Sequence, residues 1–293
     1  MKESTEMKRT LLKSSFWVSG ILTGCFLAIS AHANPFFFST GNPDGLIATG
    51  SRPSSQGKIE IESADDFILA QNTRIDHVTF TGLLPTGISL ASISQVRVEI
   101  YRVFPKDSVN PPSGNVPTRV NSPSDVAFGD RDSLLSQLSF TAMLLNPSFT
   151  AANSVLNGIN KIPAQFTGGE GPVTGEEVLF DVSLLLPFIL DPDHYFFIPQ
   201  VRVAGGDFLW LSAPKPIVAP GTPFAPDLQS WIRNANLDPD WLRIGTDITH
   251  TGPFNAAFSL SGQTTVPEPD SFILLGVGLF GIGVARKRKL TRA

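Results

Sequence analysis

The chain has 293 residues, enough for one large or two modest domains, and 42% of them are hydrophobic, as in a globular protein. Its formal net charge of −4 is unevenly spread, because residues 34–285 hold 13 basic and 24 acidic side chains, a net −11, whereas both ends are basic. A body this acidic repels nucleic acid and anionic lipid head groups, so we expect no nucleic-acid partner.

The N-terminus has the three parts of a secretory signal peptide. Residues 8–13 are positively charged, residues 16–29 are apolar, and Ala31 and Ala33 form a small-x-small cleavage site. We therefore expect residues 1–33 to form a signal helix that is removed during export.

The only cysteine, Cys25, lies inside this predicted signal peptide. Residues 22–25 (Leu-Thr-Gly-Cys) resemble the lipobox of bacterial lipoproteins, so lipidation of Cys25 is an alternative to cleavage after Ala33. Cleavage after Ala33 would leave a mature chain without disulfides or thiol chemistry, which must then depend on its hydrophobic core.

Alternating apolar and polar residues, typical of half-buried β-strands, recur through the rest of the chain. The clearest run is 95–103, where Val96, Val98 and Ile100 are predicted to face one way. In chain order we expect strands at 58–62, 65–69, 74–81, 95–103, 136–141, 177–182, 195–203, 207–212, 231–233, 241–244 and 256–261. No stretch between residues 34 and 265 keeps a helical period over three turns.

Segments rich in proline and other turn formers separate these strands. Residues 34–57 precede the first strand, residues 104–130 form a polar insertion expected to be an ordered surface loop or flap, and residues 214–226 form another loop. The pattern predicts one all-β domain over residues 34–262. We expect a single antiparallel β-sandwich, jelly-roll or immunoglobulin-like, with long Pro-rich loops.

Pairs of aspartates two residues apart occur in three of the predicted loops. They are Asp130 and Asp132, Asp191 and Asp193, and Asp238 and Asp240. Oxygen-rich loops suit Ca²⁺, so the first and third pairs are candidate calcium ligands in a chain otherwise expected to need no cofactor. The alternative is that aspartate beside proline starts turns. A glycosidase would need two carboxylates ~5–9 Å apart across a cleft, which sequence spacing does not establish.

Trp231 and Trp241 flank a loop rich in Asn, Asp and Pro. Sugar-binding β-sandwiches stack sugar rings on exposed tryptophans, so these two are candidate glycan-binding residues, with burial in the core as the alternative. Trp210 lies in an alternating strand and is expected in the core. His77 and His194 are interpreted as structural or surface residues. The sequence contains no H-x-x-x-H, H-E-x-x-H or G-x-S-x-G motif, and we expect no enzyme.

The C-terminus has three parts in a fixed order. Pro267, Glu268 and Pro269 form an extended polar signature, residues 271–285 are apolar and uncharged, and a basic cluster of Arg286, Lys287, Arg288 and Lys289 follows. Fifteen residues at ~1.5 Å each span about 22 Å, a short membrane helix beside a bilayer core of ~30 Å. The basic cluster is expected to stay on the cytoplasmic side and so to set the topology.

These residues closely resemble the PEP-CTERM sorting signal of Gram-negative bacteria, which a membrane protease-like enzyme called exosortase recognises. The resemblance covers about 28 residues and implies where the protein goes, not what its body does. Residues 276–281 also fit G-x-G-x-x-G, but neither the strand nor the later acid of a dinucleotide-binding fold accompanies them.

With the predicted signal peptide at 1–33 and the β domain at 34–262, this resemblance implies a linker at 263–270, a transmembrane helix at 271–285 and a cytoplasmic tail at 286–293. The first hypothesis is a non-catalytic exported protein. Exosortase and the inner membrane are its partners before processing, and the cell surface or extracellular matrix is its destination. The alternative is a module that binds exopolysaccharide through exposed tryptophans and acidic loops, and a hydrolase is a third hypothesis.

Overall fold

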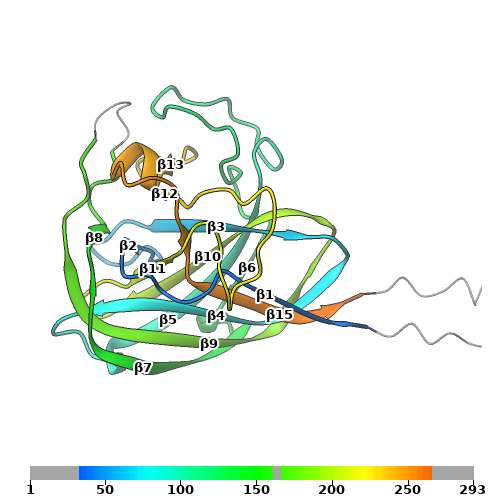
Figure 1. Ribbon diagram of the computed structural model, residues 1–293, viewed down its shortest axis with the longest axis horizontal. Coiled ribbons are helices and arrows are strands. Elements are labelled where there is room, and N and C mark those ends of the chain that lie inside the picture. The colour runs from blue at the N-terminus through cyan, green and yellow to red at the C-terminus, as the bar shows by residue number, and fades with distance from the viewer. Residues whose placement is uncertain (1–32, 161–165, 266–293) are drawn as a thin grey trace, which may run out of the picture. The chain divides into compact units, whose positions relative to one another are not determined.

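Alternating sequences fold into two β-sheets in the computed structural model, which describes residues 33–160 and 166–265 (Figure 1). The predicted all-β class is confirmed. The nine-stranded sheet contains β1 (Pro35–Ser39), β2 (Ile47–Gly50), β4 (Thr73–Pro85), β7 (Leu138–Ala151), β8 (Asn153–Val155), β9 (Val173–Leu190), β11 (Leu209–Ala213), β14 (Asn255–Ala256) and β15 (Phe258–Thr264). The six-stranded sheet contains β3 (Ile61–Leu69), β5 (Ile93–Arg102), β6 (Gly129–Asp132), β10 (Asp193–Val203), β12 (Trp231–Asn234) and β13 (Leu242–Arg243). Three short helical turns are η1 (Leu90–Ser92), η2 (Ser133–Leu135) and η3 (Ile244–Ile248).

Strand β4 organises the nine-stranded sheet. It pairs with β9 along one side, and with β15 and then β11 along the other. All pairs in this sheet are antiparallel except β2 and β8, which run parallel with Ile47 opposite Asn153. The expectation of a wholly antiparallel fold is therefore wrong at this one pair, where β8, which follows β7 after one residue, runs in the same direction as β2.

The six-stranded sheet has the order β13-β12-β3-β10-β5-β6, and β10 lies between β3 and β5. Because side chains alternate across a strand, β5 places Val96, Val98 and Ile100 in the core, as predicted. The same alternation sends Arg97 and Glu99 to the opposite, outer face of the sheet.

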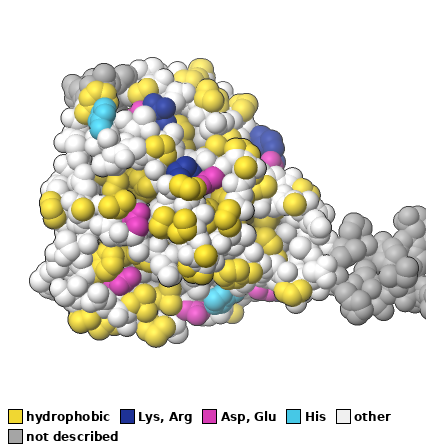
Figure 2. All heavy atoms as spheres, viewed as in Figure 1, with side chains coloured by type: hydrophobic (Ala, Val, Ile, Leu, Met, Phe, Trp, Pro, Cys, Tyr) yellow, Lys and Arg dark blue, Asp and Glu magenta, His cyan; other side chains and the backbone are white. Residues whose placement is uncertain are grey.

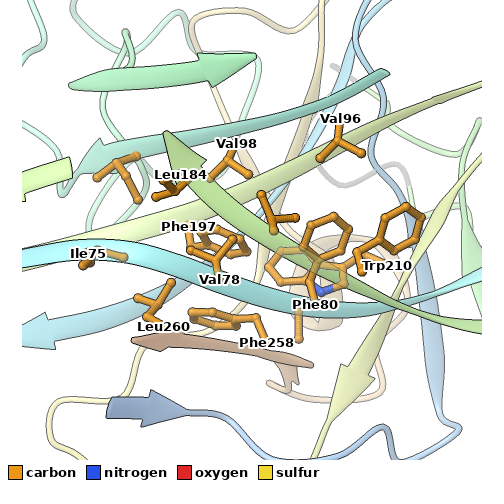
Figure 3. Packing of buried hydrophobic residues seen from close by; sticks show 14 of the residues in the cluster. Ile75, Val78, Phe80, Val96, Val98, Leu184, Phe197, Trp210, Phe258 and Leu260 are labelled. Atoms are coloured by element: carbon orange, nitrogen blue, oxygen red, sulfur yellow. The ribbon is translucent and has the colours of Figure 1, made fainter. Parts of the chain in front are cut away.

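The main core lies between the two sheets and combines aromatic rings with aliphatic side chains (Figure 3). Phe80 stacks on Phe180 with ring centroids 4.7 Å apart, and Phe197 stacks on Phe258 at 4.9 Å. Phe80, Phe180 and Phe258 come from the nine-stranded sheet, whereas Phe197 comes from β10, so the rings join the two layers. Burying such rings is worth about 1.5–3 kcal/mol each, which allows this domain to fold without disulfides.

Most predicted strands exist, with shifted ends. The predicted strands at 58–62 and 65–69 are one strand, β3, because its acids are buried and hydrogen-bonded and do not break it. Strands β1, β2 and β8, and β6 at the end of the polar insertion, were not predicted. Each has only three to five residues, too few for alternation to stand out from turn formers.

The predicted loop between β5 and β6 is ordered and lies over the outer face of the six-stranded sheet (Figure 1). Arg119 holds this loop in place through two buried ion pairs. Its guanidinium donates to Asp125 at 2.9 Å and to Asp240 at 3.1 Å. The Arg119 guanidinium also lies over the Phe104 ring, 4.6 Å from its centroid. A second layer of apolar side chains, including Trp231 and Trp241, therefore packs beneath this loop.

The first and last strands of the described chain are neighbours. Strands β1 and β15 pair antiparallel, with Pro35 opposite Gln263. The backbone of Asn34 is hydrogen-bonded to Thr264, whose N–H donates to the Asn34 carbonyl at 2.9 Å. Strand β15 extends two residues beyond the predicted domain end at residue 262. Both ends of the described chain thus leave the sheet at the same place.

Candidate functional site

A polar cleft of about 370 Å³ opens on the outer face of the six-stranded sheet, beside the loop between β5 and β6. We call it the acidic cleft, and its charged and hydroxyl-bearing lining residues are Glu60, Glu62, Arg97, Glu99, Tyr101, Asp125, Arg233 and Asp238. Strand geometry assembles them: alternate positions of β5 supply three, and the register between β3 and β12 sets Glu62 opposite Arg233. The cleft is thus built on rigid strands with one wall from a loop.

Arg233 is the central cation of the cleft and is buried. It donates to the Glu62 carboxylate, to the Asp238 carboxylate at 2.7 Å, to the Tyr101 hydroxyl at 2.9 Å and to the Asp125 carbonyl at 3.0 Å. Its guanidinium lies 4.4 Å from the centroid of the Trp241 ring. Burial, the largest single influence, would lower the pKa of Arg233, but Glu62, Tyr101 and Asp238 together outweigh it and raise that pKa. Arg233 is therefore held in place from several directions.

Glu62 and Glu99 supply two buried carboxylates of the cleft. Glu62 accepts from Arg233 and from the Tyr101 hydroxyl at 2.7 Å. Glu99 accepts from Arg97 at 2.6 Å through Oε1, while its buried Oε2 has no hydrogen-bond partner among the described residues. Burial first, and the nearby charge of Glu62 second, raise the pKa of Glu99 well above its ordinary value. Two carboxylates with different surroundings therefore share one cleft.

Trp231 and Trp241, the candidate glycan-binding residues, are 1% and 0% exposed, which favours the alternative of burial in the core. Both belong to the apolar layer beneath the loop between β5 and β6. The Trp241 indole N–H donates to the Ser124 carbonyl at 3.1 Å, which ties the loop down. Trp210 is in the core, as predicted.

The acidic pairs predicted as calcium ligands are bound by protein groups. Asp132 accepts from Gln95 and caps η2, and Asp130 lies 3.7 Å from Arg97. Asp238 and Asp240 point to different arginines, Arg233 and Arg119, and Asp240 is fully buried. No group of three or more His, Cys, Asp or Glu side chains suited to a metal ion occurs in the described part of the chain. Calcium binding here stays a prediction that would have to displace these partners.

Two histidines are held by aspartates. His194 Nε2 lies 2.6 Å from the buried Asp66, and His77 Nε2 lies 2.8 Å from Asp181 on the open face of the nine-stranded sheet. The Oγ of Ser261 lies 3.3 Å from His77 Nδ1, which completes a Ser-His-Asp row across three strands. Side chains of His77 and Asp181 are 35% and 49% exposed, so solvent reaches both groups, whereas the aspartate of a Ser-His-Asp triad is buried.

The surface follows the same pairing of charges. On the face shown in Figure 2, the visible basic side chains each lie beside an acidic one, and no wide basic patch appears on it.

The acidic cleft was not predicted from the sequence. Alternation at 58–62 and 95–103 predicts strands but does not bring their charged positions together, whereas the structure places Glu60, Glu62, Arg97 and Glu99 around one cleft. One usable signal was present: acids and arginines alternate with apolar residues in strands that become neighbours or near neighbours, which is typical of cross-strand ion pairs.

The predicted sorting residues lie outside the described residues, as do the signal helix apart from Ala33, the transmembrane helix and the basic tail. Ala33 is exposed. Within residues 33–160 and 166–265, no helix has the length and apolar character needed to cross a membrane.

Comparison with known proteins identifies the C-terminus. Residues 265–289 match the family model of the PEP-CTERM protein-sorting motif. Neither the curated proteins nor the solved structures gave a match to this chain. The resemblance recognised in Pro267, Glu268 and Pro269 is thus confirmed, and the chain carries the PEP-CTERM sorting signal of an exosortase substrate.

Proposed function

We propose that this protein is an exported, non-catalytic β-sandwich that exosortase processes at its C-terminal signal and delivers to the cell surface or the extracellular matrix. The observation that carries the proposal is the position of the signal relative to the fold. The last strand ends at Thr264, and the matched motif begins at residue 265. Exosortase could therefore cut near Pro267 without removing any described strand.

The N-terminus supports the same route. Strand β1 begins at Pro35, two residues after the predicted cleavage site at Ala33. Removal of residues 1–33 would therefore leave the ladder between β1 and β15 whole. In this proposal residues 1–33 direct export, residues 271–285 hold the precursor in the inner membrane, and the basic cluster from Arg286 to Lys289 keeps the tail in the cytoplasm.

The test replaces Pro267, Glu268 and Pro269 by alanine in a host that has exosortase. We expect the variant to be exported and folded but to keep its C-terminus, because the recognition residues are gone. Intact-mass measurement of the membrane-bound and released protein reports this directly. The matched control is Val266→Ala, next to the motif, which should be processed normally. Normal processing of the triple variant would overturn the proposal.

Lipidation of Cys25 is tested separately by Cys25→Ser. If the signal peptide is cut after Ala33, the mature protein begins at Asn34 and its mass is unchanged by the substitution. A mature N-terminus at residue 25 with added lipid mass would replace signal-peptide cleavage with the lipoprotein route. Binding of exopolysaccharide through Trp231 and Trp241 is not part of the proposal, because both indoles are buried.

A further inference from the structure

The size and lining of the acidic cleft define what fits it. Its volume of about 370 Å³ lies at the small end of the range of ligand pockets. Arginine, carboxylate and tyrosine hydroxyl groups line most of it, and the aromatic faces nearest to it are covered by Arg233. An apolar ligand would have to desolvate these charges without replacing their hydrogen bonds, so the occupant is polar.

The charge of the cleft selects the sign of the occupant. Five carboxylates line it against two guanidinium groups, those of Arg97 and Arg233. One of the five, Asp125, is already neutralised from behind by Arg119 at 2.9 Å. Glu99 has a raised pKa and is not counted as a full negative charge. The remaining three acids, Glu60, Glu62 and Asp238, still outnumber the two arginines, so the cleft disfavours phosphate, sulfate or carboxylate ligands and favours a cation.

Unused hydrogen-bonding capacity points to a donor. Glu99 is 2% exposed, and its Oε2 accepts no hydrogen bond among the described residues. Beside the cleft, Gln200 donates to Glu60 at 2.9 Å, while its own buried Oε1 also has no partner among those residues. The two arginines of the cleft are directed to other carboxylate, carbonyl and hydroxyl oxygens. Buried acceptors of this kind are costly to leave unpaired.

We propose that the acidic cleft binds a small polar molecule through a primary ammonium group, as presented by an amino sugar or a diamine. An ammonium brings one positive charge, which compensates the excess of carboxylates, and three N–H donors, which can pair with the unpaired oxygens. Glu99 and Glu60 receive the ammonium, and Arg97, 29% exposed as a side chain, donates to a hydroxyl of the ligand. The proposal does not depend on the sorting signal and goes beyond it.

The experiment is isothermal titration calorimetry on the full chain in detergent, with four probes: glucosamine, putrescine, glucose and N-acetylglucosamine. We expect heat and saturation at millimolar concentration or below for glucosamine, and none for glucose or N-acetylglucosamine, which lack the charge. Binding of putrescine as well as glucosamine assigns the site to primary amines in general. Binding of glucosamine alone assigns it to amino sugars.

Variants locate the site. Glu60→Gln and Glu99→Gln keep side-chain shape and should each weaken glucosamine by about tenfold to a hundredfold, the range for a hydrogen bond to a charged group. Asp191→Asn is the matched control, because it removes one negative charge from an exposed turn outside the cleft and should bind as the parent does. The proposal fails if no amine binds, if glucose binds as tightly as glucosamine, or if both cleft variants retain parental affinity. Circular dichroism of each variant verifies that it is folded.

Discussion

Glu99 on β5 approaches Glu62 on β3 across the intervening strand β10, and the charge of Glu62, second only to burial, raises the pKa of the Glu99 carboxyl. The two acids differ in what holds them. Tyr101 and Arg233 both donate to Glu62, whereas one oxygen of Glu99 is left without a donor among the described residues. An ionised Glu99 is therefore a source of instability that the fold tolerates.

Glu99→Gln is expected to stabilise the protein at neutral pH. The amide keeps an acceptor for Arg97 and removes a buried charge that lacks full compensation, a change worth about 1–3 kcal/mol in the free energy of unfolding. Urea unfolding at pH 7 measures it, with Asp191→Asn as the exposed control, expected within about 0.5 kcal/mol of the parent. A Glu99→Gln protein less stable than the parent would show that the charge is favourable where it lies.

Stability of the parent is expected to fall as the pH rises from about 4.5 towards 8. Burial raises the pKa values of Asp65, Asp66 and Glu99 in the folded state above those of the unfolded chain. For acids shifted this way, the unfolded chain loses its protons at a lower pH than the folded protein does. The free energy of unfolding therefore falls as the pH rises through the folded-state pKa. Asp125 and Asp193 have pKa values lowered from 3.8, so their contribution makes stability rise with pH, but only at pH values below this range. Thermal unfolding across this range checks the slope, and a melting temperature that rises with pH would contradict it.

Arg119→Ala is expected to release the loop between β5 and β6. It leaves the buried carboxylates of Asp125 and Asp240 without their cation, which costs about 3–5 kcal/mol. Limited proteolysis should then cut between residues 104 and 128, where the parent is expected to resist. Arg74→Ala, which breaks an ion pair with Asp76 at a side chain 41% exposed, should cost less than about 1 kcal/mol and leave the loop protected.

Trp231→Phe and Trp241→Phe form a matched pair of core substitutions. Both indoles are buried, but only Trp241 donates its N–H, to the Ser124 carbonyl, whereas the N–H of Trp231 has no partner among the described residues. We expect Trp241→Phe to be the more destabilising by about 1 kcal/mol, the net worth of one hydrogen bond. Chemical unfolding of the two variants measures the difference, and equal losses would mean that the Ser124 bond contributes nothing.

Alternation in the sequence predicted the strands and their buried faces, but it did not predict contacts between segments that are far apart in the chain. Val96, Val98 and Ile100 were predicted to share one face because they alternate along the strand, and that face lies in the core. The sorting signal was recognised because it is one continuous stretch of sequence. Burial of Trp231 depends instead on a loop more than a hundred residues earlier, which no local pattern reveals. The meeting of Glu62 and Glu99 in one cleft depends in the same way on the long-range pairing of β3, β10 and β5.

The antiparallel pairing of β1 with β15 has a mechanical consequence. The two ends of the described chain leave the same end of neighbouring strands. Tension between these ends would therefore break the Asn34–Thr264 hydrogen bonds first and the other hydrogen bonds of the ladder one after another. Strands loaded this way give way at lower force than strands pulled past one another, where all bonds share the load. Before signal-peptide removal and exosortase cleavage, a domain held at both ends would thus unfold at low force. Cleavage at either end removes the point at which that force is applied.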